Sequence, residues 1–211
     1  MKLTMNTIRD CFNIILSGNK KESHLAARQV RKLLYNSGSN SRSRFKDIEN
    51  QINRAPADYA DITEEWRQEN FIMAISVIYF LRSKEKEFDF FFPWFFKLLL
   101  HSNGNIRYAA VRMITTDLGP LTVYIRVSNF KSTEIKGLSK ERSDEILFFL
   151  FIGLNYLLAK TWKPAYEKYD YVDSLPTSPY KSVQMVMARM YEFCGDRYME
   201  KLVQKYKQNL R

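Results

Sequence analysis

The feature of this sequence that most constrains its fold is the scarcity of glycine and proline, with 7 Gly and 6 Pro among 211 residues. Typical chains use about 7% Gly and about 5% Pro, and the tight turns of β-rich and α/β folds depend on these two residues. The shortage disfavours a β-sandwich, a nucleotide-binding α/β domain and a disordered chain. It favours long helices joined by few turns.

Apolar residues recur at helical spacing along most of the chain, and this periodicity predicts eight to ten helices. The predicted helices cover residues 4–17, 21–35, 44–53, 61–82, 88–101, 105–116, 138–163, 180–194 and 196–209. Most glycines and prolines fall between these helices, and many connections are short. We therefore expect a single all-α domain over residues 1–211, built from stacked antiparallel helix hairpins.

Three segments between these helices are predicted to interrupt the helical pattern. Residues 54–61, which include Pro56, are predicted to be a connector, because proline disrupts a helix interior. Residues 117–120, Asp-Leu-Gly-Pro, are predicted to end a helix. Residues 121–129, LTVYIRVSN, are rich in β-branched side chains, so this is the one place where a strand competes with helix.

Two helix starts have polar signals. Asp61 and Glu64 have the spacing of a capping box, and Glu65 adds negative charge in the first turn, where the helix dipole favours it. The long helix over 138–163 is expected to begin at Ser139 or Ser143, since serine is a preferred N-cap residue.

One segment resembles a known repeat. Residues 101–118 read HSNGNIRYAAVRMITTDL, with asparagines at the turn, the pair Ile106-Arg107, and the small pair Ala109-Ala110. This pattern resembles the loop and second helix of a HEAT repeat. Small residues let a neighbouring helix approach closely, and the arginine can bond carbonyls or a turn side chain of an adjacent repeat. Residues 25–34, LAARQVRKLL, match the same pattern more loosely.

The resemblance implies an α-solenoid or curved stack of helix pairs with a binding surface along one face. It also implies that Arg107 and Arg112 serve packing between repeats. Some HEAT-like proteins are DNA glycosylases that act on alkylated bases, but no catalytic aspartate aligns with any of the tryptophans, Trp66, Trp94 and Trp162. The hypothesis of such an enzyme predicts a concave pocket in which an aromatic residue lies beside a carboxylate.

The chain carries a net charge of +10, which attracts polyanions. Residues 1–54 contain 11 Lys and Arg against 4 Asp and Glu, and residues 180–211 contain 7 against 3. Within these blocks, helical spacing groups basic residues into common faces. The candidate binding residues are Arg28, Arg31, Lys32, Arg42, Arg44, Lys46, Arg197, Lys201 and Lys205. The alternative is that these stripes are ordinary solvated faces.

Patterns that carry chemistry are missing from the sequence. It has no CxxC, HExxH or glycine-rich phosphate loop, and its two histidines lie on different predicted elements. We therefore predict no catalytic residues, no metal site and no cofactor. Cys11 and Cys194 are interpreted as core residues of a protein in a reducing, cytoplasmic setting.

Two apolar runs are interpreted as buried helices and not as membrane spans. Residues 146–159 would be about 21 Å long as a helix, shorter than the roughly 30 Å core of a bilayer. Residues 88–100 contain Asp89, Pro93 and Lys97. Whether the stretch from Phe88 to Phe96 is core or partly an interface is left open.

The leading functional hypothesis is a non-catalytic interaction module that binds a macromolecular partner through a concave or basic face. A nucleic-acid-binding protein that contacts phosphates is the first alternative, and a diverged HEAT-like DNA-repair enzyme is the second. The expected partner is a protein or a polyanion such as nucleic acid, and the oligomeric state is left open.

Overall fold

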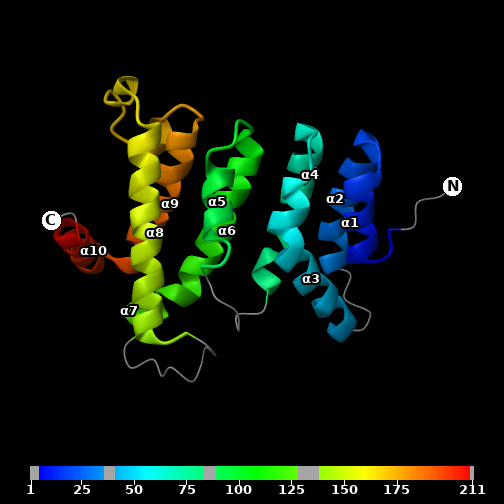
Figure 1. The fold of residues 1–211 in the computed structure, drawn as a ribbon, viewed down its shortest axis with the longest axis horizontal. Helices are drawn as coiled ribbons and strands as arrows, with labels where there is room; N and C mark the ends of the chain where they lie inside the picture. Colours follow the sequence, from blue (N-terminus) through cyan, green and yellow to red (C-terminus); the bar gives the residue numbers. More distant parts are fainter. Residues whose placement is uncertain (1–4, 36–40, 83–88, 128–137, 210–211) are drawn as a thin grey trace. The chain divides into compact units, whose positions relative to one another are not determined.

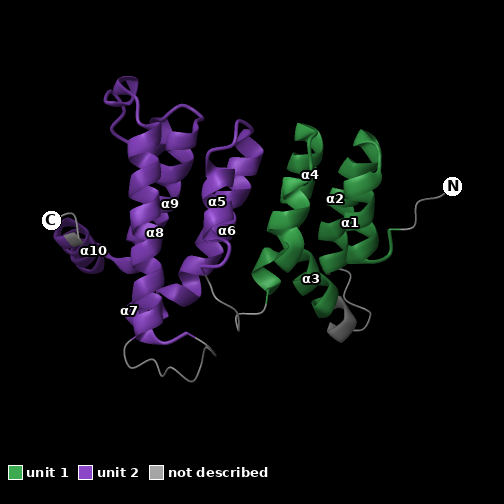
Figure 2. Cartoon of the chain, in the orientation of Figure 1, with its two compact units in different colours: residues 1–83 green, residues 84–211 purple. Residues whose placement is uncertain are grey.

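The chain is all-α in a computed structural model that describes residues 5–35, 41–82, 89–127 and 138–209, as the sequence predicted. These residues contain ten α-helices and no strand. Contacts divide the chain into two compact units, Met1–Ser83 and Lys84–Arg211 (Figure 1 and Figure 2). Each unit is described by itself, and the expectation of a single domain stays a prediction.

In its described residues, unit 1 (residues 1–83) contains four α-helices and one short 3₁₀ turn. They are α1 (Ile8–Ser17), α2 (Lys20–Tyr35), α3 (Ser41–Ala60), α4 (Glu65–Ile78) and η1 (Tyr79–Leu81). The first two helices form a hairpin, and α4 packs on α2 while also contacting α1 and α3. The four helices therefore enclose one core.

Aromatic and branched side chains fill the core of unit 1. Phe12 of α1 and Phe71 of α4 meet edge to face, with ring centroids 5.6 Å apart, which is a preferred arrangement for aromatic pairs. Other fully or almost fully buried residues are Cys11, Ile15, Ala26, Val30, Ile48, Ile52 and Ile75. Burial raises the pKa of the Cys11 thiol to about 11, with a smaller contribution from Asp10.

Polar side chains cap the N-termini of α1 and α2 in the same way. Thr7 Oγ1 accepts from the Asp10 backbone N–H at 3.0 Å, and Asp10 accepts from the Thr7 N–H at 3.2 Å. Asn19 and Glu22 repeat this reciprocal capping at α2. The capping box predicted at Asp61 and Glu64 is wrong: Glu64 is the N-cap residue of α4, and its side chain makes no capping bond there.

The helix predicted over 44–53 is confirmed within α3, but α3 runs on through Pro56 to Ala60, so the connector predicted over 54–61 is wrong for residues 54–60. Ile48, Ile52 and Ala55 lie on one buried face that continues up to the proline. Packing of this face outweighs the backbone hydrogen bond that a proline removes from a helix interior.

Unit 2, residues 84–211, contains six α-helices and two 3₁₀ turns in its described part. They are α5 (Phe92–Leu99), α6 (Gly104–Leu121), α7 (Val123–Arg126), α8 (Lys140–Thr161), η3 (Pro164–Tyr166), η4 (Val172–Ser174), α9 (Pro179–Cys194) and α10 (Asp196–Asn209). Helix α9 packs on both α6 and α8, and α5 pairs with α6. Helix α9 therefore lies at the centre of this unit.

Two expectations about the middle of unit 2 are corrected. Helix α6 does not end at residues 117–120 but continues through Pro120 to Leu121, because Leu118 and Leu121 are fully buried. The described part of residues 121–129 is helical in α7 and forms no strand; residues 128–129 lie outside the described residues. Of the two serines predicted to begin α8, Ser139 is the N-cap residue, and its side chain accepts from the Arg142 N–H at 3.1 Å.

The aromatic segment before α6 is mostly core. Phe91, Phe92, Trp94 and Phe95 are buried, whereas Phe90 is 61% exposed; Phe88 lies outside the described residues. Among the helices described for this chain, none combines the length and apolarity needed to cross a membrane. The cytoplasmic location stays a prediction.

Candidate functional site

The three basic residues predicted on the last helix surround one cleft of unit 2. Arg197, Lys201 and Lys205 follow each other at four-residue steps on α10, and Lys140 of α8 contributes a fourth cation. The cleft has a volume of about 650 Å³ and is lined by Tyr124, Ile125, Lys140, Asp144, Cys194, Arg197, Tyr198, Lys201, Leu202 and Lys205. We call it the basic cleft.

Contacts between α8 and α10 hold the basic cleft in shape. The Tyr198 hydroxyl donates to Asp144 Oδ1 at 2.5 Å, and Lys205 Nζ lies 4.3 Å from the centre of the Phe148 ring. Burial, reinforced by the bond to Asp144, raises the pKa of Tyr198. Its hydroxyl therefore remains a donor to Asp144 throughout the physiological pH range.

The electrostatics of the basic cleft favour anions. Its four cationic side chains are exposed, while the single carboxylate in its lining, Asp144, is half-buried and accepts from Tyr198. Cys194 also lines the cleft, but burial raises the pKa of its thiol to about 12. A protonated thiol is a poor nucleophile. The arrangement is suited to binding an anion.

The basic residues predicted in unit 1 lie on α2 and α3. Arg28, Arg31 and Lys32 are exposed on α2, and Lys46 is exposed on α3. The side chains of Arg42 and Arg44 lie outside the described residues.

A second pocket lies in unit 1 between α2 and α4, and we call it the α2–α4 pocket. It has a volume of about 460 Å³ and is lined by Lys20, Lys21, His24, Trp66, Glu69 and Asn70. Sequence reasoning missed this pocket. The spacing of each trio places it on one side of its own helix, but no local pattern shows that α2 packs on α4.

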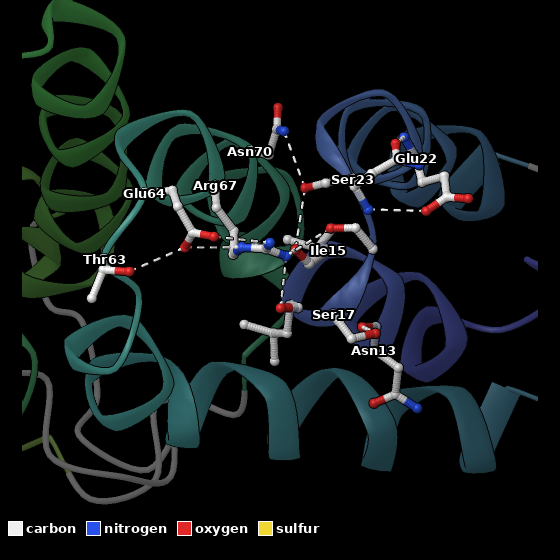
Figure 3. Close-up of polar contacts among 12 residues, drawn as sticks. Asn13, Ile15, Ser17, Glu22, Ser23, Thr63, Glu64, Arg67 and Asn70 are labelled. Atoms are coloured by element: carbon white, nitrogen blue, oxygen red, sulfur yellow. Dashed lines mark hydrogen bonds and ion pairs between the residues drawn. The ribbon is translucent and has the colours of Figure 1, made fainter.

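Arg67 contacts a lining residue of the α2–α4 pocket, because its Cζ lies 4.5 Å from the centre of the Trp66 ring. Its Nη1 lies within hydrogen-bond distance of three carbonyls at the end of α1, those of Ile15 at 3.0 Å, Leu16 at 2.7 Å and Gly18 at 3.0 Å (Figure 3). Its Nε and Nη2 donate to the two carboxylate oxygens of Glu64, at 3.3 and 3.1 Å. The guanidinium thereby ties the α1–α2 turn to the start of α4.

The Glu64 carboxylate is the acidic partner in this network. Hydrogen bonding from Arg67 is the largest cause that lowers the pKa of Glu64. Because the carboxylate of Glu64 stays ionised and bidentate, it fixes the plane of the guanidinium as well as its position.

A buried polar pair lies beside this network. The Ser23 hydroxyl donates to the Ile15 carbonyl at 3.2 Å and accepts from Asn70 Nδ2 at 3.1 Å. Ser23 is fully buried and Asn70 is 9% exposed. Figure 3 shows the amide oxygen of Asn70 pointing away from Ser23.

Arg107 lies in a comparable place in unit 2. It is 4% exposed, and its Nη1 donates to the carbonyls of His101 and Ser102, both at 2.6 Å. Its Nε donates to Ser182 Oγ of α9 at 3.3 Å. Burial lowers the pKa of Arg107. Arg112, for which the same packing role was predicted, is exposed on α6.

The described residues contain no group of three or more His, Cys, Asp or Glu side chains that could hold a metal ion. In comparisons with known proteins, no family model, no curated protein and no solved structure matches the chain. The resemblance to HEAT repeats therefore stays a prediction, and we argue function from the basic cleft and the α2–α4 pocket.

Proposed function

We propose that this chain is a non-catalytic interaction module that binds an anionic macromolecular partner through the basic cleft of unit 2. The observation that carries the proposal is the convergence of Lys140, Arg197, Lys201 and Lys205 on one concave surface. Two helices contribute these cations, so the cluster is more than one solvated helix face.

The spacing of the cations also supports an extended partner. Successive members of the α10 trio are four residues apart, which is about 6 Å along a helix. Such a row can contact several negative groups of one chain at once, whereas a small anion would use one or two of them.

Binding driven by these contacts should weaken with salt. The affinity of the full chain for labelled single-stranded RNA, for duplex DNA and for an acidic peptide can be measured by fluorescence anisotropy at several salt concentrations. Four phosphate contacts on a single strand predict a slope of log K against log salt of about −3. If none of the three probes binds with salt dependence near physiological ionic strength, the proposal is wrong.

A charge reversal on α10 tests whether the cleft itself is responsible. Lys201→Glu removes one contact in the cleft and should reduce the salt slope by about 1 while weakening binding. Lys207→Glu is the matched control, because Lys207 is exposed on the same helix but does not line the cleft. Equal effects of the two variants would show that only the overall charge matters.

One observation favours the second alternative, a DNA-repair enzyme: the α2–α4 pocket holds an aromatic residue, Trp66, together with a carboxylate, Glu69. This candidate predicts release of a base when the chain is incubated with DNA containing alkylated purines, measured by chromatography of the free bases. Glu69→Gln should abolish that release. Absence of release by the unaltered chain would exclude this candidate.

A further inference from the structure

We propose that the α2–α4 pocket binds one nucleotide of a single-stranded nucleic acid, with the base stacked on Trp66 and the phosphate held by Lys20 and Lys21. The proposal goes beyond the basic cleft, because it uses different residues in the other unit and does not depend on it. It also assigns the anionic partner to a chemical class.

The residue types in the pocket match the parts of a nucleotide. Lys20 and Lys21 supply two ammonium groups for a phosphate, and Trp66 and His24 supply flat aromatic surfaces. Stacking of bases on aromatic side chains beside a basic path is the common basis of single-strand binding. The pocket volume of about 460 Å³ is within the range of small-ligand sites, about 300–1,000 Å³.

The indole is held in place before any ligand arrives. Arg67 Cζ lies over the Trp66 ring, 4.5 Å from its centre, and the same guanidinium is bound to the α1 carbonyls and to Glu64 (Figure 3). One face of the Trp66 ring is therefore covered by the guanidinium of Arg67, which is itself held by hydrogen bonds. A platform that is already ordered loses less entropy when a base stacks on its other side.

The hydrogen-bonding groups in the pocket favour bases that carry an amino group. The Ser23 hydroxyl donates its hydrogen to the Ile15 carbonyl, so Ser23 Oγ can only act as an acceptor toward Asn70. The Asn70 amide must therefore turn its nitrogen toward Ser23. This leaves the amide oxygen as a further acceptor on a residue that lines the pocket. Glu69 is a second side chain with acceptor oxygens among the residues that line the pocket.

Adenine and cytosine present an amino donor, whereas uracil and thymine present a carbonyl acceptor at the equivalent position. Acceptors in the pocket would attract the amino group and repel the carbonyl. We therefore expect a preference for adenine and cytosine over uracil.

The cations along the rest of α2 indicate that the ligand is a single-stranded nucleic acid and not a free nucleotide. Beyond the pocket, Arg28, Arg31 and Lys32 are exposed on the same helix. Arg28 is seven residues after Lys21, about 10 Å further along the helix axis. A strand that continues from the pocket along α2 would place its following phosphates near these cations, while a single nucleotide would not reach them.

The test compares oligoadenylate, oligocytidylate and oligouridylate of equal length, labelled at one end and titrated with the full chain at constant salt. We expect tighter binding of the first two than of oligouridylate. Trp66→Leu should weaken binding of oligoadenylate about tenfold, and Trp66→Phe should restore most of it because a stacking ring is kept. Trp162→Leu is the control, since Trp162 is 45% exposed and lies outside the pocket.

The remaining variants separate the roles of the other residues. Replacing Lys20 and Lys21 by Ala should weaken all three oligonucleotides equally and flatten the salt dependence. Glu69→Gln should reduce the preference for adenine over uracil. Equal affinity of the unaltered chain for all three oligonucleotides, or unchanged binding by a folded Trp66→Leu chain, would overturn the proposal.

The same assay distinguishes this proposal from the basic cleft. Lys201→Glu should lower affinity for every oligonucleotide without changing the ratio between oligoadenylate and oligouridylate. If Lys201→Glu has no effect while Trp66→Leu does, the cleft proposal fails and the pocket proposal stands. The converse result rejects the pocket alone.

Discussion

In each unit an arginine closes the turn of a helix hairpin, but the surroundings of the two arginines differ. In unit 1, Arg67 binds the carbonyls of the α1–α2 turn, and in unit 2, Arg107 binds those of the α5–α6 turn. Carbonyls at the end of a helix have no partner within that helix. In each unit a guanidinium from a later helix supplies the missing donors.

The two arginines differ in their counter-charge and in their reach. Arg67 has a bidentate carboxylate partner in Glu64, and its carbonyl acceptors lie 49–52 residues earlier in the chain. Arg107 binds two carbonyls only 5 and 6 residues earlier, with Ser182 as its third partner. Among the described residues, no carboxylate pairs with it. A buried arginine can therefore close a turn with neutral acceptors alone.

The largest effect is expected from Arg107→Met. The variant keeps much of the apolar stem but removes every donor from two carbonyls and one hydroxyl, and hydrogen bonds to charged groups contribute about 1.5–3 kcal/mol each. We expect the free energy of unfolding to fall by about 3 kcal/mol, measured by urea unfolding with circular dichroism. Arg112→Met on the same helix is the control and should change it by less than about 0.5 kcal/mol.

Arg67→Met should have a smaller effect, about 2 kcal/mol. The Arg67 side chain is 12% exposed, and Glu64, at 44% exposed, is left in water and not buried alone. Arg54→Met removes an ion pair from a side chain that is 73% exposed and should cost less than about 0.5 kcal/mol. If Arg67→Met costs more than Arg107→Met, counter-charge and not burial determines the strength of these closures.

The smallest effect concerns acidification of the Glu64–Arg67 pair. Because the folded state lowers the pKa of Glu64, its stabilising contribution is complete above its ordinary value of 4.5 and is lost as pH falls through the folded value. The urea midpoint of the unaltered chain should therefore drop more between pH 7 and pH 3 than that of Glu64→Gln.

Salt provides the control for this pH comparison. Glu64 is accessible to solvent, so 1 M salt should screen its attraction to Arg67 and reduce the difference between the two chains. An identical pH response of both chains at low salt would mean that the pair contributes nothing to stability. That result would leave the carbonyl contacts as the shared function of the two arginines.

Local patterns predicted the helices and their arrangement in hairpins, but not which helices far apart in the sequence pack on one another. The row of Arg197, Lys201 and Lys205 could be predicted because four-residue spacing on one helix is a local property. Lys140 could not, since its place in the basic cleft depends on how α8 meets α10. Arg67 has no sequence signal either, because its three carbonyl partners belong to a turn that lies about fifty residues away.

Proline was the main source of wrong boundaries. Pro56 and Pro120 were expected to mark connectors, yet both lie inside helices. A proline in a helix interior costs a few kcal/mol. The buried residues beside each proline favour a continuous helix by a comparable amount. Only the tertiary structure shows which of the two is larger.

The burial of both cysteines has a practical consequence for labelling chemistry. Alkylating reagents attack the thiolate, and the pKa values of about 11 for Cys11 and about 12 for Cys194 keep both thiols protonated at neutral pH. The sequence contains no other cysteine. A cysteine introduced on an exposed position beside either pocket would therefore be the fast-reacting thiol of the chain, so a fluorophore attached there can follow binding at that pocket alone.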